Sequence, residues 1–400
     1  MQSPSHPSRY GWVIVAAMFL TQTISSGLGF YNMSIYMVEF SKSLQVSLAQ
    51  ASFAVTLFFM VGGVTGMYVA RLLERVHVRW IMVAGALVGG AALSATVLVD
   101  SLWQLYALYI LFGAGYTCVS LVVATTLITQ WFPGPTRSVA LSIASTGLSF
   151  GGVIITPATA YLFNIYGAPA TIPWLGVAFA GLILPLALWV VRPAPQQIVG
   201  AQRHNTGRWT YRSAIRTRFF ILLSVGYVFC QASQVGGIAH LYNRVEGMAG
   251  FEKAAIAVQI LTVCSILGRF AGGWLAMHVP IRQFALLNLV VQMAGLGILS
   301  VAEDTATVFL GAGLFGVSIG NLLMLQPLWL AEAFSGSLYP RVFALSNAAT
   351  LLGVALGPFL LGVAFDIAGY TVAYGVAVAV CAMALVFMYL AGARPQQRVE

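Results

Sequence analysis

One arginine lies in the middle of a long apolar stretch. Arg269, within CSILGRFAGGWLAM (264–277), is the sixteenth of 24 residues in an apolar run from 254 to 277, long enough to cross a bilayer. A charge at that depth costs roughly 2.5–3.5 kcal/mol on insertion scales, so it needs a partner or a water-filled cavity. The run contains no acidic residue, which favours an anionic ligand that binds and leaves. The alternative is that Arg269 bonds helix-end carbonyls and only locks the packing.

A few polar residues near mid-depth could orient such an anion. Ser265 lies four residues before Arg269, so the two share one face of a helix. Hydroxyls and amides of other apolar spans complete the expected substrate-binding set of Arg269, Ser265, Tyr116, Asn321, Tyr31 and Gln231. The alternative for each residue is a satisfied contact between helices.

A histidine is the candidate for proton coupling. We expect His240 to end the seventh apolar span on the outer side, and its ordinary pKa near 6.5 suits proton sensing. The alternative is an interfacial helix-end histidine. No Asp or Glu lies clearly inside a span, although Glu39 and Glu332 lie near span ends. This absence disfavours carriers that move protons on membrane carboxylates.

The composition places these residues in an integral membrane protein. The chain has 400 residues, of which 60% are hydrophobic and 7% charged, against about 25% charged in soluble domains. The net charge of +9 is not clustered, and the apolar runs exclude nucleic-acid binding as the main function. The four cysteines fall inside apolar spans as small core residues. Since no catalytic or metal-binding motif is found, we expect neither an enzyme nor a cofactor or metal.

The apolar runs predict an all-α membrane protein with twelve transmembrane helices. They cover about 12–38, 50–70, 80–99, 102–130, 138–163, 170–191, 219–241, 254–277, 283–302, 305–331, 342–365 and 370–391. The polar segment 192–218 separates six spans from six, so we expect halves at 1–191 and 219–400 joined by a cytoplasmic linker.

The two halves repeat with an offset near 202 residues. The sequence LFG occurs at 111–113 and 314–316, and Phe132 corresponds to Phe334. The other matches are Arg137 with ALS at 140–142 and Arg341 with ALS at 344–346, FNI at 163–165 and FDI at 365–367, and Arg192-Pro193 and Arg394-Pro395. Two homologous six-helix halves are predicted, and substrate sites of such folds lie near mid-depth between the halves.

Charges predict the orientation. Fifteen basic residues fall on the side of the two termini, against three on the other side, Lys42, Arg244 and Lys253. The fifteen are Arg9, Arg71, Arg75, Arg79, Arg137, Arg192, Arg203, Arg208, Arg212, Arg216, Arg218, Arg282, Arg341, Arg394 and Arg398. Both termini are therefore expected in the cytoplasm. The arginines at 208, 212 and 216 recur as on one helix face, which predicts that 203–218 lies on the cytoplasmic membrane surface.

Glycines and prolines predict close or bent helices. Pairs four residues apart let helix backbones approach each other, and they are Gly62/Gly66, Gly85/Gly89, Gly147/Gly151, Gly268/Gly272, Gly316/Gly320 and Gly353/Gly357. Pro157 and Pro358 are expected to bend or break their helices.

The loop after the second span reads GMYVARLLERVHVRW, residues 66–80, and resembles the loop signature of the major facilitator superfamily. The matching residues are Gly66, Glu74, Arg75 and Arg79, with Glu in place of the family's Asp and His77 in place of its middle Gly. The resemblance implies a gating role; the alternative is a solvated basic loop. Arg137 and Arg341 pair with Glu74 or Glu332 in one interpretation and are only topology signals in the other.

The repeat and this loop resemble that superfamily along almost the whole chain. Within it, YGWVIV at 10–15 and GRFAGGWL at 268–275 are similar to the monocarboxylate transporter and oxalate/formate antiporter branch, in which an arginine of the eighth helix binds the substrate carboxylate. Arg269 matches that arginine. Arg9 and Gly268 replace two acidic residues of animal carriers, and 342–365 lacks the antiporter's second basic residue. One positive charge suits a monoanion.

The predicted function is secondary transport of small monocarboxylates, of lactate or pyruvate size, by alternating access. The expected partners are the organic anion, a co-transported proton and the bilayer, in a monomer of the bacterial inner membrane. The alternatives are a carrier of another organic anion and a drug exporter. A nutrient sensor that has lost transport would be expected to add a cytoplasmic signalling domain, for which 192–218 is too short.

Overall fold

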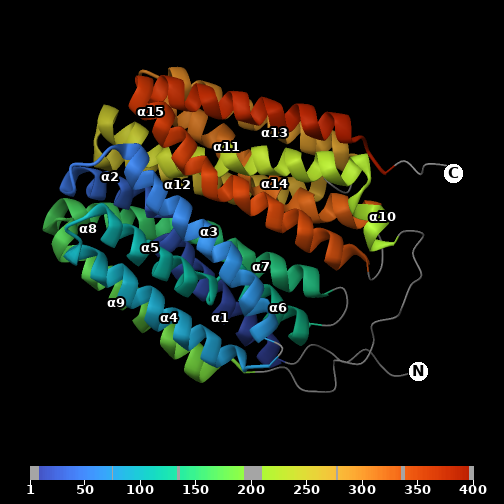
Figure 1. Cartoon of the computed structure of the whole chain (residues 1–400), viewed down its shortest axis with the longest axis horizontal. Helices are drawn as coiled ribbons and strands as arrows, with labels where there is room; N and C mark the ends of the chain where they lie inside the picture. Colours follow the sequence, from blue (N-terminus) through green and yellow to red (C-terminus); the bar gives the residue numbers. More distant parts are fainter. Residues whose placement is uncertain are drawn as a thin grey trace. The chain divides into compact units, whose positions relative to one another are not determined.

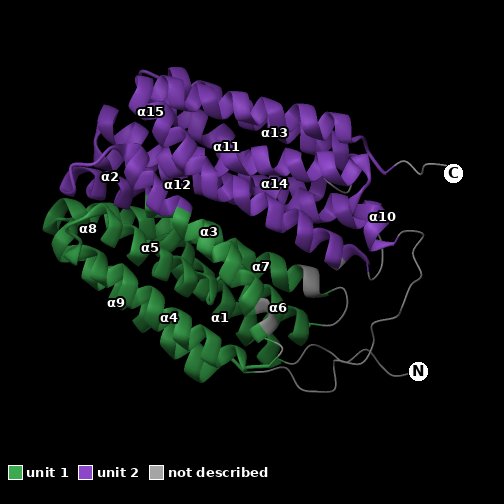
Figure 2. Ribbon diagram, viewed as in Figure 1, with its two compact units in different colours: residues 1–33, 57–202 green, residues 34–56, 203–400 purple. Residues whose placement is uncertain are grey.

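The computed structural model describes residues 9–73, 75–132, 136–192, 210–275, 278–334 and 338–395, with only the backbone at 70, 71, 137, 138 and 340. The chain forms two compact units (Figure 2). Unit 1 comprises Met1–Met33 and Leu57–Gln202, and unit 2 comprises Ser34–Thr56 and Arg203–Glu400. The expected halves at 1–191 and 219–400 stay a prediction, and most of the expected linker lies outside the described residues.

Helices make up the first half of the sequence (Figure 1). In chain order they are α1 (Arg9–Ser26), η1 (Gly27–Tyr31), α2 (Met33–Ser43), α3 (Leu48–Leu72), α4 (Val78–Ala95), η2 (Thr96–Leu98), α5 (Leu102–Thr117), α6 (Leu121–Trp131), α7 (Thr136–Phe150), η3 (Gly151–Ile155), α8 (Thr156–Tyr166), α9 (Ala168–Pro185) and η4 (Leu186–Val190). The η1, η3 and η4 segments are π-helical, and η2 is a 3₁₀ turn. The η3 segment ends two residues before Pro157, where the expected disturbance of the fifth span occurs.

The second half contains fewer and longer helices (Figure 1). They are α10 (Tyr211–Ile215), α11 (Arg218–Ala249), α12 (Phe251–Leu275), α13 (Ile281–Val301), α14 (Thr305–Ala333) and α15 (Tyr339–Ala391). Within α15 the backbone leaves the helical region at Ala368 and Gly369, and Gly369 has a φ of 74°, which favours glycine. Because this break divides α15 into two spans, the eleven long apolar helices of the described residues give the predicted twelve spans.

Equivalent glycines make equivalent contacts in the two halves. A methyl group on Gly113 would lie 2.3 Å from the carbonyl oxygen of Phe58, and one on Gly316 would lie 2.3 Å from that of Leu261. These are the glycines of the two LFG sequences, so the repeat in the sequence marks a contact that only glycine permits.

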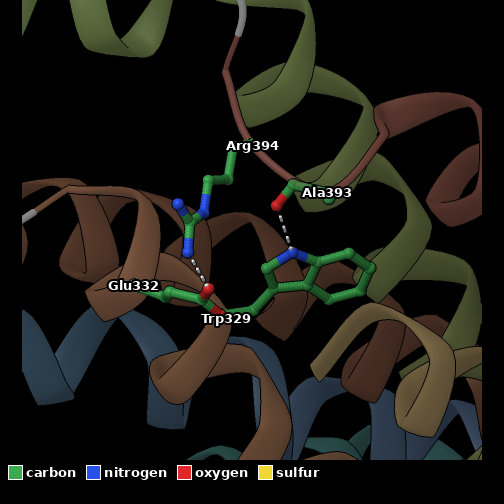
Figure 3. A network of polar contacts seen from close by, with 4 residues as sticks. All are labelled: Trp329, Glu332, Ala393 and Arg394. Atoms are coloured by element: carbon green, nitrogen blue, oxygen red, sulfur yellow. Dashed lines mark hydrogen bonds and ion pairs between the residues drawn. The ribbon is translucent and has the colours of Figure 1, made fainter. Parts of the chain in front are cut away.

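The ends of corresponding helices are also held alike. The indole Nε1 of Trp131 donates to the carbonyl of Arg192, and that of Trp329 donates to the carbonyl of Ala393, each at 3.1 Å. Figure 3 shows the second of these bonds beside an ion pair between Arg394 and Glu332, 2.6 Å apart. The tryptophans anchor the residues that follow the sixth and twelfth spans.

Two of the four cysteines lie in the core as expected. Cys230 and Cys381 are buried, whereas Cys118 and Cys264 are only half-buried. Within the described ranges, no group of three or more His, Cys, Asp and Glu side chains could hold a metal ion.

Candidate functional site

Arg269 lies on α12, six residues before the helix ends at Leu275, and its side chain is half-buried. The helix begins at Phe251, three residues earlier than the apolar run, so Arg269 is nearer one end than its expected position at mid-depth. Residues 276 and 277 of the predicted span lie outside the described part of the chain. Arg269 is nevertheless a full charge within a helix long and apolar enough to cross a membrane.

Close packing between α12 and α14 places Arg269 beside Ser265. A methyl group on Gly320 of α14 would lie 2.4 Å from the carbonyl oxygen of Ser265 and 3.1 Å from Cβ of Arg269. Both residues therefore face α14, as their four-residue spacing predicts. Ser265 is fully buried.

Asn321 joins this group from α14. Its Nδ2 donates to Oδ1 of Asn288 on α13 at 3.0 Å and to the carbonyl of Val317 at 3.2 Å. Its Oδ1 faces α12, because a methyl group on Gly272 would lie 1.8 Å from that oxygen. Gly272 comes one helical turn after Arg269, so three of the six predicted residues meet where α12 and α14 cross.

Sequence reasoning missed Gln234, which lies on α11. Its side chain is 1% exposed, and Nε2 donates to the carbonyl of Ile319, next to Gly320, at 3.4 Å. Gln231, one turn earlier, is also buried. Two glutamines three residues apart on an apolar helix were the signal available in the sequence.

Several oxygens in this region have no hydrogen-bond donor. They are Oε1 of Gln231, Oε1 of Gln234, Oγ of Ser265 and Oδ1 of Asn321, each buried and without a partner among the described residues. A buried polar atom without a partner costs free energy. Such oxygens could accept hydrogen bonds from a ligand that carries a hydroxyl or another hydrogen-bond donor.

Tyr31 and Tyr116 come together in unit 1. Tyr31 ends the π-helical segment η1 and is buried, and Tyr116 lies next to the end of α5. A methyl group on Gly29 would lie 2.7 Å from Cδ2 of Tyr116, and the Tyr116 ring centroid is 5.0 Å from that of Phe58. The two tyrosines therefore lie in unit 1, whereas Arg269, Ser265, Asn321 and the two glutamines lie in unit 2.

The predicted gating residues are only partly described. Arg75 is exposed, and Nη2 of Arg79 donates to the carbonyl of Val191 at 3.3 Å. The guanidinium of Arg341 lies over the ring of Tyr211, 5.6 Å from its centroid. Glu74 and the side chain of Arg137 lie outside the described residues, so the gating role stays a prediction. Glu332 is paired with Arg394 (Figure 3).

The expected position of His240 at a helix end was wrong. The helix α11 continues for nine residues to Ala249, and His240 is fully buried within it. Its Nε2 is 2.9 Å from the carbonyl oxygen of Pro358 and 3.5 Å from Oγ of Ser52. The polar residues after His240 end the apolar run without ending the helix.

Comparison with known proteins finds similar transporters in bacteria and animals. The chain is 23% identical to an uncharacterized transporter, YcxA, of Bacillus subtilis (strain 168), over 93% of this chain and 92% of the relative. It is 24% identical to monocarboxylate transporter 13 of Rattus norvegicus, over 92% and 86%. It is 27% identical to the oxalate:formate antiporter of Oxalobacter formigenes, over 66% and 61%.

Solved structures show the same fold. A bacterial homologue of the human lysosomal transporter Spinster, in an inward-facing and occupied conformation, matches with a TM-score of 0.77 at 16% identity, over 97% of each chain. The family model described as Major Facilitator Superfamily matches residues 18–329. Members of this family are membrane transporters, so the prediction that the chain is not an enzyme is confirmed. With its twelve helices in two repeated halves, this multi-pass membrane protein belongs to the Major Facilitator Superfamily.

Proposed function

We propose that the protein carries small monocarboxylates, of lactate or pyruvate size, by alternating access. The observation that carries the proposal is the Arg269 guanidinium on an apolar helix, beside Ser265 and Asn321. The guanidinium supplies two parallel donors for the two carboxylate oxygens. The Ser265 hydroxyl can donate to the carboxylate, and Oδ1 of Asn321 can accept from a hydroxyl of the substrate, which lactate has. Similarity to a monocarboxylate transporter and to an oxalate:formate antiporter supports an anionic substrate.

One positive charge favours a monoanion over a dianion. The helical stretch of α15 before the break at Ala368 contains one basic residue, Arg341, in its first turn and stacked on Tyr211. Exchange of another organic anion is the second candidate, and the similarity to an antiporter supports it. A drug exporter is the remaining alternative.

We propose that the protein lies in the bacterial inner membrane as a monomer with both termini in the cytoplasm. The orientation is supported by the excess of basic residues on the side of the termini. Tags at residues 1 and 400 should resist protease added to intact cells, and digestion of either tag would contradict this topology.

The test of the carboxylate site uses Arg269→Lys and Arg269→Gln. Lysine keeps the charge but loses the two-donor geometry, so it should retain weak binding, whereas glutamine should lose most binding. Removing one partner of a desolvated charged pair costs on the order of 2–5 kcal/mol, or roughly 30-fold or more in affinity. Binding and exchange of labelled lactate and pyruvate are measured with the purified protein and in proteoliposomes.

Arg244 provides a matched control. It lies on α11, and its guanidinium donates to the carbonyls of Leu299 and Ala302 at the end of α13, which is the packing role offered as the alternative for Arg269. Arg244→Gln should therefore lower the folded yield and leave substrate affinity unchanged. A well-folded Arg269→Gln protein that carries its substrate at the wild-type rate would end the carboxylate proposal.

A further inference from the structure

Unit 2 also contains a buried titratable residue, His240, at the place where α3, α11 and α15 meet. The imidazole is fully buried, with Nε2 2.9 Å from the carbonyl oxygen of Pro358. A carbonyl oxygen only accepts, so Nε2 carries a hydrogen atom and donates. The second nitrogen, Nδ1, is buried and has no partner among the described residues. In the neutral ring Nδ1 is therefore a lone pair with no donor, and it is the atom that can take up a proton.

Charged and titratable groups near the His240 ring lie on α15 and α11. On α15, Asp366 acts electrostatically on His240, and the Tyr370 ring centroid lies 6.2 Å from that of His240. On α11, the guanidinium of Arg244 lies over Tyr370, 6.0 Å from its centroid. The start of α3, LAQASFAVT, presents Ser52 and contains no titratable side chain.

The charges of α2 are engaged with another part of α11. Lys42 is 3.5 Å from Glu246, and Glu39 and Glu246 both act electrostatically on Tyr242. Asp366 is therefore the anion available to balance a charge on His240.

Asp366 also holds the start of α3. Its Oδ2 accepts from the backbone N–H of Ala49 at 3.1 Å, in the first turn of α3. The same stretch contacts α15 elsewhere, because Phe53 packs against Phe359 at 5.4 Å, and a methyl group on Gly362 would lie 2.8 Å from Oγ of Ser52. The Asp366 carboxylate thus accepts a hydrogen bond from the first turn of α3 and also interacts electrostatically with the buried His240 imidazole.

We propose that Nδ1 of His240 is a proton-binding site that controls how firmly the start of α3 is attached to α11 and α15. A proton on Nδ1 makes the ring an imidazolium, and a buried charge requires a counter-charge. The imidazolium attracts the Asp366 carboxylate and weakens its bond to Ala49. The attachment of Leu48–Thr56 is therefore firm when His240 is neutral and loose when it is charged. As a step that regulates a carrier, this inference rests on the transport function proposed above.

Hydrogen exchange tests the site without any substrate. Protection of the amides at 48–56, corrected for the intrinsic effect of pH, is compared in the purified wild-type protein between pH 8 and about pH 4, because burial disfavours the charged ring and protonation requires acid. Protection should fall on acidification in the wild type and should not change in His240→Gln. The control is His278→Gln, because His278 is exposed and bonds the carbonyl of Trp274 at 2.9 Å through Nδ1. Equal pH dependence in His240→Gln and the wild type would overturn the proposal.

Asp366→Asn gives a second test that keeps His240. The carboxylate stabilises the charged ring, so its removal should move the midpoint of the protection change to lower pH. An unchanged midpoint in the folded variant would overturn the proposal, even where His240→Gln gives too little protein to measure.

Transport separates this proposal from the proposed function. If wild-type proteoliposomes exchange no monocarboxylate while the protection of 48–56 still depends on His240, the substrate assignment fails and the proton site stands. If they exchange lactate but protection shows no dependence on His240, the proton site fails alone.

Discussion

Two equivalent helix crossings in this protein are built from different chemistry. Where α4 crosses α5, a methyl group on Gly115 would lie 2.4 Å from the backbone nitrogen of Gly89, and one on Gly85 would lie 2.4 Å from Cβ of Cys118. The equivalent positions in the second half lie 203 residues later, at the crossing of α13 and α14. Gly115, Gly89, Gly85 and Cys118 correspond in this order to Ser318, Gln292, Asn288 and Asn321. There the contact is made by side chains, with Asn321 donating to Asn288 and Ser318 to Gln292.

The same fold therefore tolerates a backbone contact in one half and a buried amide network in the other. The glycine crossing of α4 and α5 depends on the close approach of two helix backbones. The amide crossing of α13 and α14 depends on the directional hydrogen bonds between side chains. Gln292 extends the network to Ser233 and Cys381, on α11 and α15. The half with the amide network also holds Arg269, so the network fixes the helices that present the charge.

The helices differ in the same sense. In the first half, the π-helical segments η1 and η3 interrupt two spans, and α5 and α6 are separated after Thr117. The corresponding α11 and α14 are continuous. Local π-helical turns often occur at functional positions. The irregularities at η1 and after Thr117 therefore lie in the first half, at positions whose counterparts in α11 and α14 are regular.

Exchanging the residues at one equivalent position should give the largest effect. Gly115→Ser places a side chain against the backbone of Gly89 and should cost about 1–3 kcal/mol or more, through overpacking. Ser318→Gly, the reverse change, should cost only about 1 kcal/mol. Melting in detergent compares the two variants, and equal melting temperatures would remove the distinction between the crossings.

The amide pair should show coupling of intermediate size. Asn288→Ala and Asn321→Ala should be non-additive by about 0.6 kcal/mol, with about 1.7 kcal/mol as the upper bound seen for such bonds in membranes. Asn321→Ala should also weaken substrate binding, because Asn321 contacts α12 at Gly272.

Gln326, a second buried amide of α14, provides the control for this cycle. It donates to Ser346 and Thr350, so Gln326→Ala should combine additively with Asn288→Ala. Additivity of all three substitutions would show that the Asn288–Asn321 bond contributes nothing specific.

A smaller effect is expected in the first half at Tyr116. Tyr116→Phe removes one hydroxyl and keeps the ring against Gly29 and Phe58, so the fold should be unchanged. Loss of one hydrogen bond of about 0.5–1.5 kcal/mol would lower substrate affinity by roughly 2- to 10-fold. Unchanged affinity would confine substrate recognition to the second half.

The smallest effect is expected at the ion pair of Glu332 and Arg394 (Figure 3). Both side chains are well exposed, and such pairs contribute about 0–1 kcal/mol. In the first half, Arg192 instead lies over the ring of Tyr10, 5.0 Å from its centroid. Glu332→Gln should therefore lower stability slightly, and only at low salt. A large loss that persists at high salt would contradict this estimate.

The spans were predictable because crossing a bilayer requires long apolar runs, and most predicted ends agree with the helices to within a few residues. The exception is α11, where Asn243, Arg244 and Glu246 end the apolar run while the helix continues to Ala249, so the sequence misplaced His240 at the helix end. At the site, the spacing of Ser265 and Arg269 correctly placed both against one neighbouring helix. The bond between Asn288 and Asn321 was not predictable, since partners 33 residues apart meet only when α13 packs on α14.

Residues Ser34–Thr56 come from the first half of the sequence but belong to unit 2. Cutting the chain after Gln202 would leave all of unit 1 on the first fragment, together with this helical hairpin. The second fragment would lack the hairpin that bears Lys42 and Ser52, the partners of Glu246 and His240. In fragment complementation, the first fragment therefore supplies the hairpin that the second fragment lacks. Both fragments should have to be synthesised together to recover a folded unit 2.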